Sequence, residues 1–210
     1  MTQTEKVHFL EAFTNPRSVA FLGANEEVLK NMGAQQLLNL IDGRYKGRIY
    51  PIHLRLESVF GYKAYKKISD LPEVPDLAVV ILPTRVIHQI FEEIGQFGVK
   101  NVVLVTAGFR ETNNLKGEKE LKEIANKYGF RFLGPNCIGF INTRCKIDEN
   151  MHCILNCTLI SYPLGSGNVS IISQSGTFAS HTNFLLKERD LHLAKVFSVG
   201  NEANIDVCDC

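Results

Sequence analysis

The stretch that decides the fold runs from residue 77 to residue 105 and reads LAVVILPTRVIHQIFEEIGQFGVKNVVLV. Leu77 to Leu82 is an unbroken apolar run, typical of a parallel strand covered on both faces. Apolar residues at helical spacing then predict a helix that ends at Gly98: Val86, Ile87, Ile90, Phe91, Ile94 and Phe97. Val102 to Val105 follows as a second strand. This order predicts one unit of a parallel α/β sheet.

The same pattern continues on both sides of this unit. Residues 17–23 (RSVAFLG) and 48–52 (RIYPI) read as strands, with a helix between them that ends at Asp42-Gly43. After residue 105, a second helical stripe ends at Gly129 and the strand 130–133 (FRFL) follows. Strands that alternate with helices to about residue 142 predict a doubly wound parallel sheet with right-handed crossovers.

The pattern weakens after residue 142. Residues 143–166 carry no clear period, which indicates a connection with an irregular strand, and the strand and helix signals restart at Asn168. We therefore expect a first domain at 1–145, a connection at 146–167 and an incomplete second α/β domain at 168–210. Two strands and one helix are too few to close a core. This last piece should belong to a longer domain, or pack on the first domain or on a partner.

Composition and charge exclude several function classes. The chain has 210 residues, of which 45% are hydrophobic and 21% charged, and its formal net charge of +1 gives no global attraction for nucleic acid or an anionic membrane. The N-terminus, MTQTEKVHFLEAF, has neither the apolar core of a signal peptide nor that of an anchor. No apolar run approaches the roughly 18 residues of a membrane span, so we expect a cytoplasmic protein.

The cysteines predict reduced thiols. None of the six shows paired C-x-x-C spacing, and the chain has no export signal, so disulfides are not expected. Cys145, Cys153 and Cys157 are a minor metal-binding candidate, and reduced structural thiols are the simpler interpretation.

Two turns at the start of a helix could hold a phosphate group. Gly23-Ala24-Asn25 lies between a strand and a helix, where backbone N–H groups and the helix dipole favour anions. An ordinary βα turn explains the same residues. In Ser173-Gln174-Ser175-Gly176-Thr177, two hydroxyl groups and free N–H groups converge at a helix start and could bind a phosphoryl group. Simple N-capping by serine is the alternative.

Two further loops leave strands at the same edge of the predicted sheet, where ligands collect in open α/β sheets. Thr106-Ala107-Gly108 is either a binding loop or a structural turn. Gly134-Pro135-Asn136-Cys137-Ile138-Gly139 breaks off sharply after its strand. Cys137 is a candidate nucleophile, but the sequence offers it no nearby histidine, so a packed thiol is the better interpretation.

Several segments together resemble a known family, in the order in which they occur there: FTNPRSVAFLGAN (13–25), KGRIYPIH (46–53), GYKAY (61–65), PDLAVVILP (75–83), GVKNVVLVTAGFRET (98–112), FRFLGPNCIGFIN (130–142), GNVSIISQSGTFAS (167–180) and FSVGNEANID (197–206). The family is the NDP-forming acyl-CoA synthetases, which includes acetate–CoA ligase (ADP-forming) and the succinyl-CoA synthetase α-subunit. The resemblance covers nearly the whole chain.

The resemblance implies a CoA-binding domain of Rossmann type followed by the start of a flavodoxin-like ligase domain. Such enzymes make an acyl-CoA from an acid, CoA and ATP or GTP through an acyl phosphate and a phosphohistidine. The residues that it implies for CoA binding are Gly23, Ala24, Asn25, Arg55, Pro83, Thr84, Thr106, Ala107, Gly108, Asn136, Cys137 and Ile138. Ser173, Ser175 and Gly176 match the helix start that stabilises the phosphohistidine.

The chain departs from the family pattern in its phosphate loops. Glu26 and Glu27 stand where a proline-glycine-lysine-like stretch is usual, and two carboxylates near a polyphosphate weaken binding unless they point away. Residues 53–57 (HLRLE) keep one cation but lose the glycines that allow close backbone approach.

The resemblance also implies that catalysis needs sequence outside these residues. His181 and His192 do not match the phosphohistidine motif, and the nucleotide-grasp domain that would bring ATP or GTP and magnesium is absent. We expect the 210 residues alone to be inactive and to work with a partner chain or further domains, in an oligomer.

Three functions stay open at this point. The first is the CoA-binding portion of an acid–CoA ligase. The second is a non-catalytic CoA or nucleotide sensor or interaction subunit, suggested by Glu26, Glu27 and Leu56. An NAD-dependent dehydrogenase domain is a distant third, because the glycine spacing is wrong and Glu57 is poorly placed to bind a ribose. The sequence does not identify the acid that would be activated.

Overall fold

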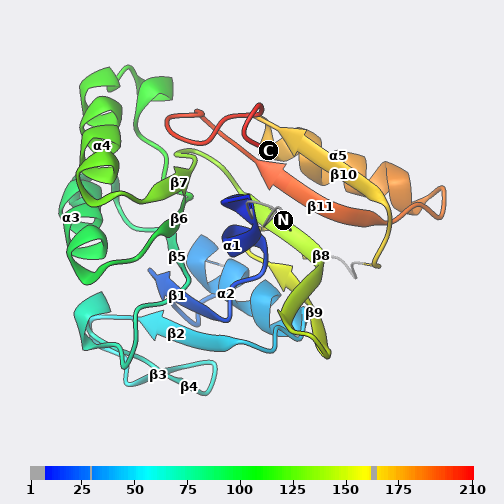
Figure 1. The fold of residues 1–210 in the computed structure, drawn as a ribbon, viewed down its shortest axis with the longest axis horizontal. Helices are drawn as coiled ribbons and strands as arrows, with labels where there is room; N and C mark the ends of the chain where they lie inside the picture. Colours follow the sequence, from blue (N-terminus) through cyan, green and yellow to red (C-terminus); the bar gives the residue numbers. More distant parts are fainter. Residues whose placement is uncertain (1–7, 29, 162–164) are drawn as a thin grey trace, which may run out of the picture.

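A parallel sheet of five strands forms the first half of the protein (Figure 1). The computed structural model describes residues 8–28, 30–161 and 165–210. Within them the strand order is β2-β1-β5-β6-β7, and every neighbouring pair is parallel. The strands are β1 (Ser18–Leu22), β2 (Arg48–Ile52), β5 (Leu77–Val80), β6 (Asn101–Leu104) and β7 (Arg131–Leu133). The predicted doubly wound α/β sheet is confirmed.

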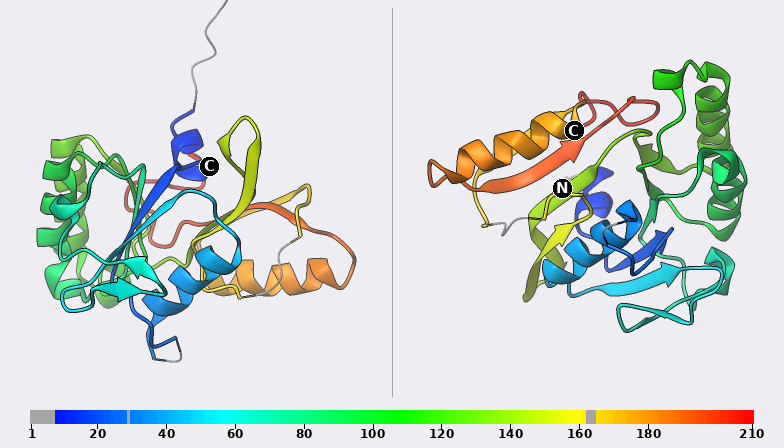
Figure 2. Two further views of the ribbon diagram at one scale, coloured as in Figure 1. Left: turned by 90° about the horizontal axis from the view of Figure 1, so that it is seen from below. Right: turned by 180° about the vertical axis from the view of Figure 1, so that it is seen from behind.

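Helices cover both faces of this sheet, with α3 and α4 on one side and α2 on the other (Figure 2). The helices are α1 (Leu10–Thr14), α2 (Met32–Asp42), α3 (Ile87–Phe97) and α4 (Leu115–Tyr128). Gly98 and Gly129 end α3 and α4 in the left-handed conformation, as predicted from their positions. Along β1, Val19 and Phe21 enter the core towards α2, whereas Ala20 and Leu22 enter the core towards α3.

Short elements complete the first half. A two-stranded hairpin, β3 (Ser58–Val59) and β4 (Tyr62–Lys63), follows β2. Single turns of 3-10 helix lie at η1 (Ile68–Asp70), η2 (Thr84–Val86) and η3 (Arg110–Thr112).

The second half contains a four-stranded mixed sheet of order β10-β11-β8-β9. Its elements are β8 (Gly139–Asp148), β9 (Met151–Asn156), β10 (Val169–Ser173), α5 (Gly176–Lys187) and β11 (Leu193–Ser198). β10 and β11 are parallel, and β8 is antiparallel to both β11 and β9. The restart of the pattern at Asn168 and the helix after Ser175 are as predicted.

The structure corrects the expectation of an irregular connection, because the end of β8 and all of β9 lie within residues 146–167. Thr143 and Cys145 are buried and alternate with exposed Arg144 and Lys146, so this part of β8 has the period of a strand with one buried face. The pattern was missed because the buried residues are cysteine and threonine. Residues 162–164, inside the predicted connection, lie outside the described residues, as do Leu29 and residues 1–7.

The β8–β9 hairpin explains how the short C-terminal piece closes a core. β11 pairs with β8, and the rings of Phe140 and Phe197 stack with their centroids 5.7 Å apart. Phe13 of α1 meets Phe140 edge-on at 6.5 Å. The piece therefore packs on the first half of the chain, one of the outcomes expected for it. The predicted domain boundaries stay predictions.

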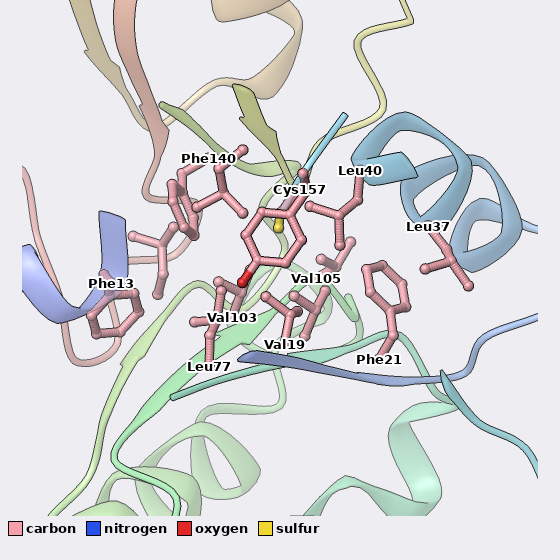
Figure 3. Packing of buried hydrophobic residues seen from close by; sticks show 14 of the residues in the cluster. Phe13, Val19, Phe21, Leu37, Leu40, Leu77, Val103, Val105, Phe140 and Cys157 are labelled. Atoms are coloured by element: carbon pink, nitrogen blue, oxygen red, sulfur yellow. The ribbon is translucent and has the colours of Figure 1, made fainter. Parts of the chain in front are cut away.

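One apolar core joins the two sheets (Figure 3). Val19, Leu77 and Val103 of the parallel sheet point towards Leu40 of α2 and towards Cys157, which follows β9. A buried hydrogen bond also connects α2 to the segment after β9, because the Asn39 amide donates to the Thr158 carbonyl at 2.7 Å. Helix α2 is thus held between the parallel sheet and the hairpin.

Candidate functional site

A cavity of about 540 Å³ lies at the carboxyl ends of β1, β2 and β5. β1 is flanked by β2 on one side and by β5 on the other, so the strand order changes direction at this point. Ligands of open α/β sheets bind in the crevice outside such a switch point. Five predicted residues line the cavity: Gly23, Ala24, Asn25, Arg55 and Pro83. That these five residues bind a ligand stays a prediction.

The turn after β1 forms one wall of the cavity. Gly23 has φ +99°, and an added Cβ would overlap the Ile81 carbonyl at the end of β5, so this position requires glycine. The Asn25 side chain accepts a hydrogen bond from the Glu27 N–H at 2.8 Å and shapes the turn. Asn31 caps α2 by accepting hydrogen bonds from Gly33 N–H at 2.8 Å and Ala34 N–H at 3.2 Å. The positive end of α2 therefore faces the cavity.

The two acidic residues of this loop do not line the cavity. Glu26 instead accepts a hydrogen bond at 2.7 Å from the backbone N–H of Phe60, at the tip of the β3–β4 hairpin. Polyphosphate binding requires these carboxylates to point away from the phosphates, and the Glu26 carboxylate points away from the cavity.

Three cationic side chains line the cavity: Arg55, Lys66 and Lys67. Arg55 was predicted from the sequence, and the two lysines were not. Backbone pairing places the two lysines next to the end of β2. Ile52 and Tyr65 form an isolated parallel β-bridge, and the Tyr65 carbonyl accepts a hydrogen bond from the His53 N–H at 2.9 Å. Gly61, at the tip of the intervening hairpin, was the available signal that the chain turns back here.

The charges at this wall are mostly unpaired. Lys67 lies 3.7 Å from Asp70, whereas the side chains of Arg55 and Lys66 make no ion pair within the described residues. Within the described residues, one carboxylate, that of Glu93 on α3, also lines the cavity. The site thus combines a cationic rim, a helix N-terminus and apolar walls, which is the chemistry that a phosphorylated ligand with an apolar moiety requires.

The predicted loops at residues 83–84 and 106–108 are hydrogen-bonded to each other beside the cavity-lining residue Pro83. Thr84 Oγ1 donates to the Ala107 carbonyl at 2.6 Å, and Thr106 Oγ1 donates to the Leu82 carbonyl at 2.8 Å. Gly108, with φ +105°, packs against Thr84 and donates its N–H to Glu111. Of these residues only Pro83 lines the cavity, and the hydrogen bonds connect Thr84, Thr106, Ala107 and Gly108 to the segment that carries it.

The loop 134–139 lies between the two sheets rather than at the cavity. Cys137 is buried, its Sγ donates to the Leu104 carbonyl at 3.4 Å, and burial raises the pKa of its thiol to about 12. Burial and the raised pKa favour a packed thiol over a nucleophile at Cys137. The Asn136 amide donates to Asn201 at 3.3 Å, and the Ile138 carbonyl accepts from Gln36 of α2 at 2.8 Å.

The predicted phosphoryl-binding residues lie at the start of α5. Ser175 caps this helix, because its Oγ accepts from the Phe178 N–H at 3.1 Å. Ser173 Oγ accepts from the Ser175 N–H at 3.1 Å. Gly176 packs against Ile138, so this turn adjoins the loop 134–139. N-capping is therefore observed, and a phosphoryl site stays a prediction.

Among the residues that the structure describes, no group of three or more histidine, cysteine or acidic residues is placed to hold a metal ion. In the same residues, none of the helices has the length and apolar character that a bilayer crossing requires.

The sequence profile of a family described as "CoA binding domain" matches residues 17–143, which include the whole parallel sheet and its cavity. The chain belongs to the CoA-binding domain family. A second profile, "Succinyl-CoA ligase like flavodoxin domain", matches residues 166–210. Both matches confirm the fold and the coenzyme A prediction made from the motifs.

Similar proteins contain this CoA-binding domain within longer chains. The chain is 41% identical over 202 residues to the alpha subunit of acetate–CoA ligase (ADP-forming) II of Pyrococcus furiosus, covering 95% of this chain and 42% of the relative. It is 38% identical to acetate–CoA ligase (ADP-forming) of Methanocaldococcus jannaschii, covering 95% of this chain and 27% of the relative. A solved structure, acetyl-coenzyme A synthetase 1 of Ca. Korarchaeum cryptofilum with phosphate and ADP, superimposes with a TM-score of 0.86 at 35% identity, covering 95% and 41% of the two chains.

Proposed function

We propose that this chain is the CoA-binding portion of an ADP-forming acid–CoA ligase. The observation that carries the proposal is the cavity at the switch point, where the Gly23 turn faces the cations Arg55, Lys66 and Lys67. The chain spans less than half the length of relatives that are named acetate–CoA ligases. The complete reaction therefore belongs to a longer protein or to an assembly of chains.

The cavity fits the chemistry of coenzyme A. The turn Gly23-Ala24-Asn25 and the N-terminus of α2 would hold the diphosphate, because fixed N–H dipoles stabilise anions there without reorganisation. Arg55, Lys66 and Lys67 would neutralise the phosphates. Apolar walls for the adenine come from β1, β2, η1, the segment after β5, and α3: Leu22, Ile52, Ile68, Ile81, Leu82 and Ile90. CoA supplies the thiol that accepts the acyl group.

The remaining parts of the cycle are proposed to lie on other sequence. The phosphohistidine and the site for ATP or GTP and magnesium would come from further domains or a partner chain, as in an α-subunit that works with a second subunit. Ser173, Ser175 and Gly176 would then present the N-terminus of α5 to the phosphoryl group. We expect the assembly to be oligomeric.

The alternative of a non-catalytic sensor loses part of its motivation. It rested on acidic residues in the phosphate loop, and Glu26 is turned towards Phe60 instead of into the cavity. Leu56 does not line the cavity either. No contact of the described residues favours the sensor over the ligase portion.

Calorimetric titration with CoA tests the proposal directly. We expect binding that weakens by about fivefold in Kd in Lys66→Gln, the effect of roughly 1 kcal/mol from one exposed ion pair, and further in Arg55→Gln with Lys66→Gln. Lys122→Gln, on the exposed face of α4 and outside the cavity, is the matched control and should bind like the parent. Absence of binding at millimolar CoA, or equal losses in the control, contradicts the proposal.

A further inference from the structure

A second cavity, of about 650 Å³, lies at the other end of α2 from the cavity at the carboxyl ends of β1, β2 and β5. It is formed by the chain after α2 and by the β8–β9 hairpin. The charged residues and the thiol that line it are Arg44, Lys46, Arg144, Lys146, His152 and Cys153. Its lining within the described residues includes no carboxylate.

The positive charge of this cavity is not neutralised by the protein. Arg44, Lys46 and Lys146 form no ion pair within the described residues. Within the described residues, the Arg144 guanidinium donates to two neutral partners, Ser166 Oγ at 3.1 Å and Asn168 Oδ1 at 2.7 Å. Because the formal net charge of the whole chain is only +1, this cluster is a local excess of positive charge. It favours a small anion over a neutral or cationic molecule.

Cys153 reaches this cavity and has a second thiol beside it. It lies directly opposite Cys145 in the antiparallel β8–β9 pair. Opposite residues in such pairs have Cα atoms about 4.5 to 5.5 Å apart, within the range of about 4.4 to 6.8 Å that disulfides span. Cys145 is buried and Cys153 is half-buried, and both are free thiols. The pair could therefore close a disulfide with little movement of the strands.

The two thiols differ in reactivity. The interaction with the Cys145 thiol, together with the Lys46 backbone N–H and side-chain charge, lowers the pKa of the Cys153 thiol. The same interaction and burial raise the pKa of Cys145. Burial also raises the pKa of Cys157 to about 12. Cys153 is thus the accessible thiol with thiolate character, and Cys145 is placed to react second.

We propose that Cys153 and Cys145 are a thiol-exchange site for a small disulfide that carries phosphate or carboxylate groups. The Cys153 thiolate attacks one sulfur of this disulfide, a mixed disulfide forms, and one small thiolate leaves. Cys145 then gives up its proton to solvent and attacks the Cys153 sulfur, which displaces the second small thiolate. Two protein thiols are oxidised to one disulfide, and one small disulfide is reduced to two thiols. The site is independent of the proposed ligase function.

The test compares two oxidants on the purified protein, with peptide mass mapping over time. With glutathione disulfide, which is anionic, we expect a Cys145–Cys153 crosslink in the parent and a mixed disulfide trapped at Cys153 in Cys145→Ser. Neither should form in Cys153→Ser. The doubly substituted Arg44→Gln and Lys146→Gln protein should react several-fold more slowly with glutathione disulfide and unchanged with neutral bis(2-hydroxyethyl) disulfide.

Cys208, which is exposed, serves as an internal reference in every sample, and circular dichroism reports the fold of each variant. Reaction at Cys208 alone overturns the proposal. So does reaction of Cys153 at the same rate, relative to Cys208, with the anionic and the neutral oxidant. Disulfide of coenzyme A in place of glutathione disulfide then shows which anionic group the cavity prefers.

Discussion

Glu26 Oε1 lies 2.7 Å from the backbone nitrogen of Phe60, so an acidic side chain of the β1–α2 loop fastens the β3–β4 hairpin. This contact joins two segments next to the cavity at the carboxyl ends of β1, β2 and β5, because the chain after the hairpin carries Lys66 and Lys67, which line that cavity. In the sequence, Glu26 seemed unfavourable for phosphate binding. In the structure, it holds the hairpin that precedes the cations Lys66 and Lys67.

Substitutions of Glu26 separate these two roles. Glu26→Gln keeps an acceptor for the Phe60 N–H, so we expect CoA affinity and stability close to those of the parent. Glu26→Ala removes the acceptor and should cost about 1 kcal/mol in unfolding free energy, measured by urea denaturation. A large gain in CoA affinity in Glu26→Gln, measured by calorimetry, would instead place the carboxylate against the phosphates.

Gly23 and Gly61 allow a matched test of the turn after β1. Both have positive φ, but only at Gly23 would a Cβ meet other atoms, those of Ile81. Alanine at either site carries a backbone penalty of about 1 kcal/mol, and at residue 23 we expect roughly 1–3 kcal/mol more from the overlap. Gly23→Ala should also abolish CoA binding. Equal losses of unfolding free energy in the two variants would show that the turn can shift without cost.

The parallel sheet could be predicted because its signals are local. The apolar run from Leu77 and the stripe that ends at Gly98 depend only on neighbouring residues, and the structure places both elements within two residues of the expectation. The β8–β9 hairpin carried a period of two as well, but its buried positions are Thr143 and Cys145, which composition does not mark as core.

The cationic rim could be predicted only in part. Arg55 lies in the short segment just after β2, so its place at the sheet edge follows from the strand. Lys66 reaches the same cavity through the bridge between Ile52 and Tyr65, a long-range pairing that no local pattern in the sequence specifies. In the same way, the paired position of Cys145 and Cys153 depends on the register of two strands.

Asn39 tests how firmly α2 is attached to the segment after β9. Its amide donates to the buried Thr158 carbonyl at 2.7 Å, so Asn39→Ala leaves that carbonyl without its donor and should cost about 1–3 kcal/mol in unfolding free energy. Gln35→Ala, one turn earlier on α2, removes only the side-chain bond to Asn39 at 2.9 Å and should cost less than about 1 kcal/mol. The comparison uses urea denaturation of both variants, and a larger loss in Gln35→Ala would contradict this assignment.

Glu111 should make part of the stability depend on pH. Burial raises the pKa of its carboxyl, but hydrogen bonds from Asn201 at 2.6 Å and from the N–H groups of Gly108 and Phe109 outweigh this and leave the pKa below its usual value. Because the pKa is lower in the folded state, the stabilisation is present above the unfolded pKa of about 4.3 and is lost as the pH falls through the folded pKa.

The measurement is the unfolding free energy of the parent and of Glu111→Gln from about pH 7 down to about pH 3. The difference between the two should shrink as the pH falls below about 4.3, and it should stay under about 1 kcal/mol because the carboxylate is largely exposed. Glu149→Gln is the control, since that side chain makes no hydrogen bond or ion pair within the described residues. A difference that grows on acidification would mean that the Asn201 and Gly108 contacts do not favour the charged form of Glu111.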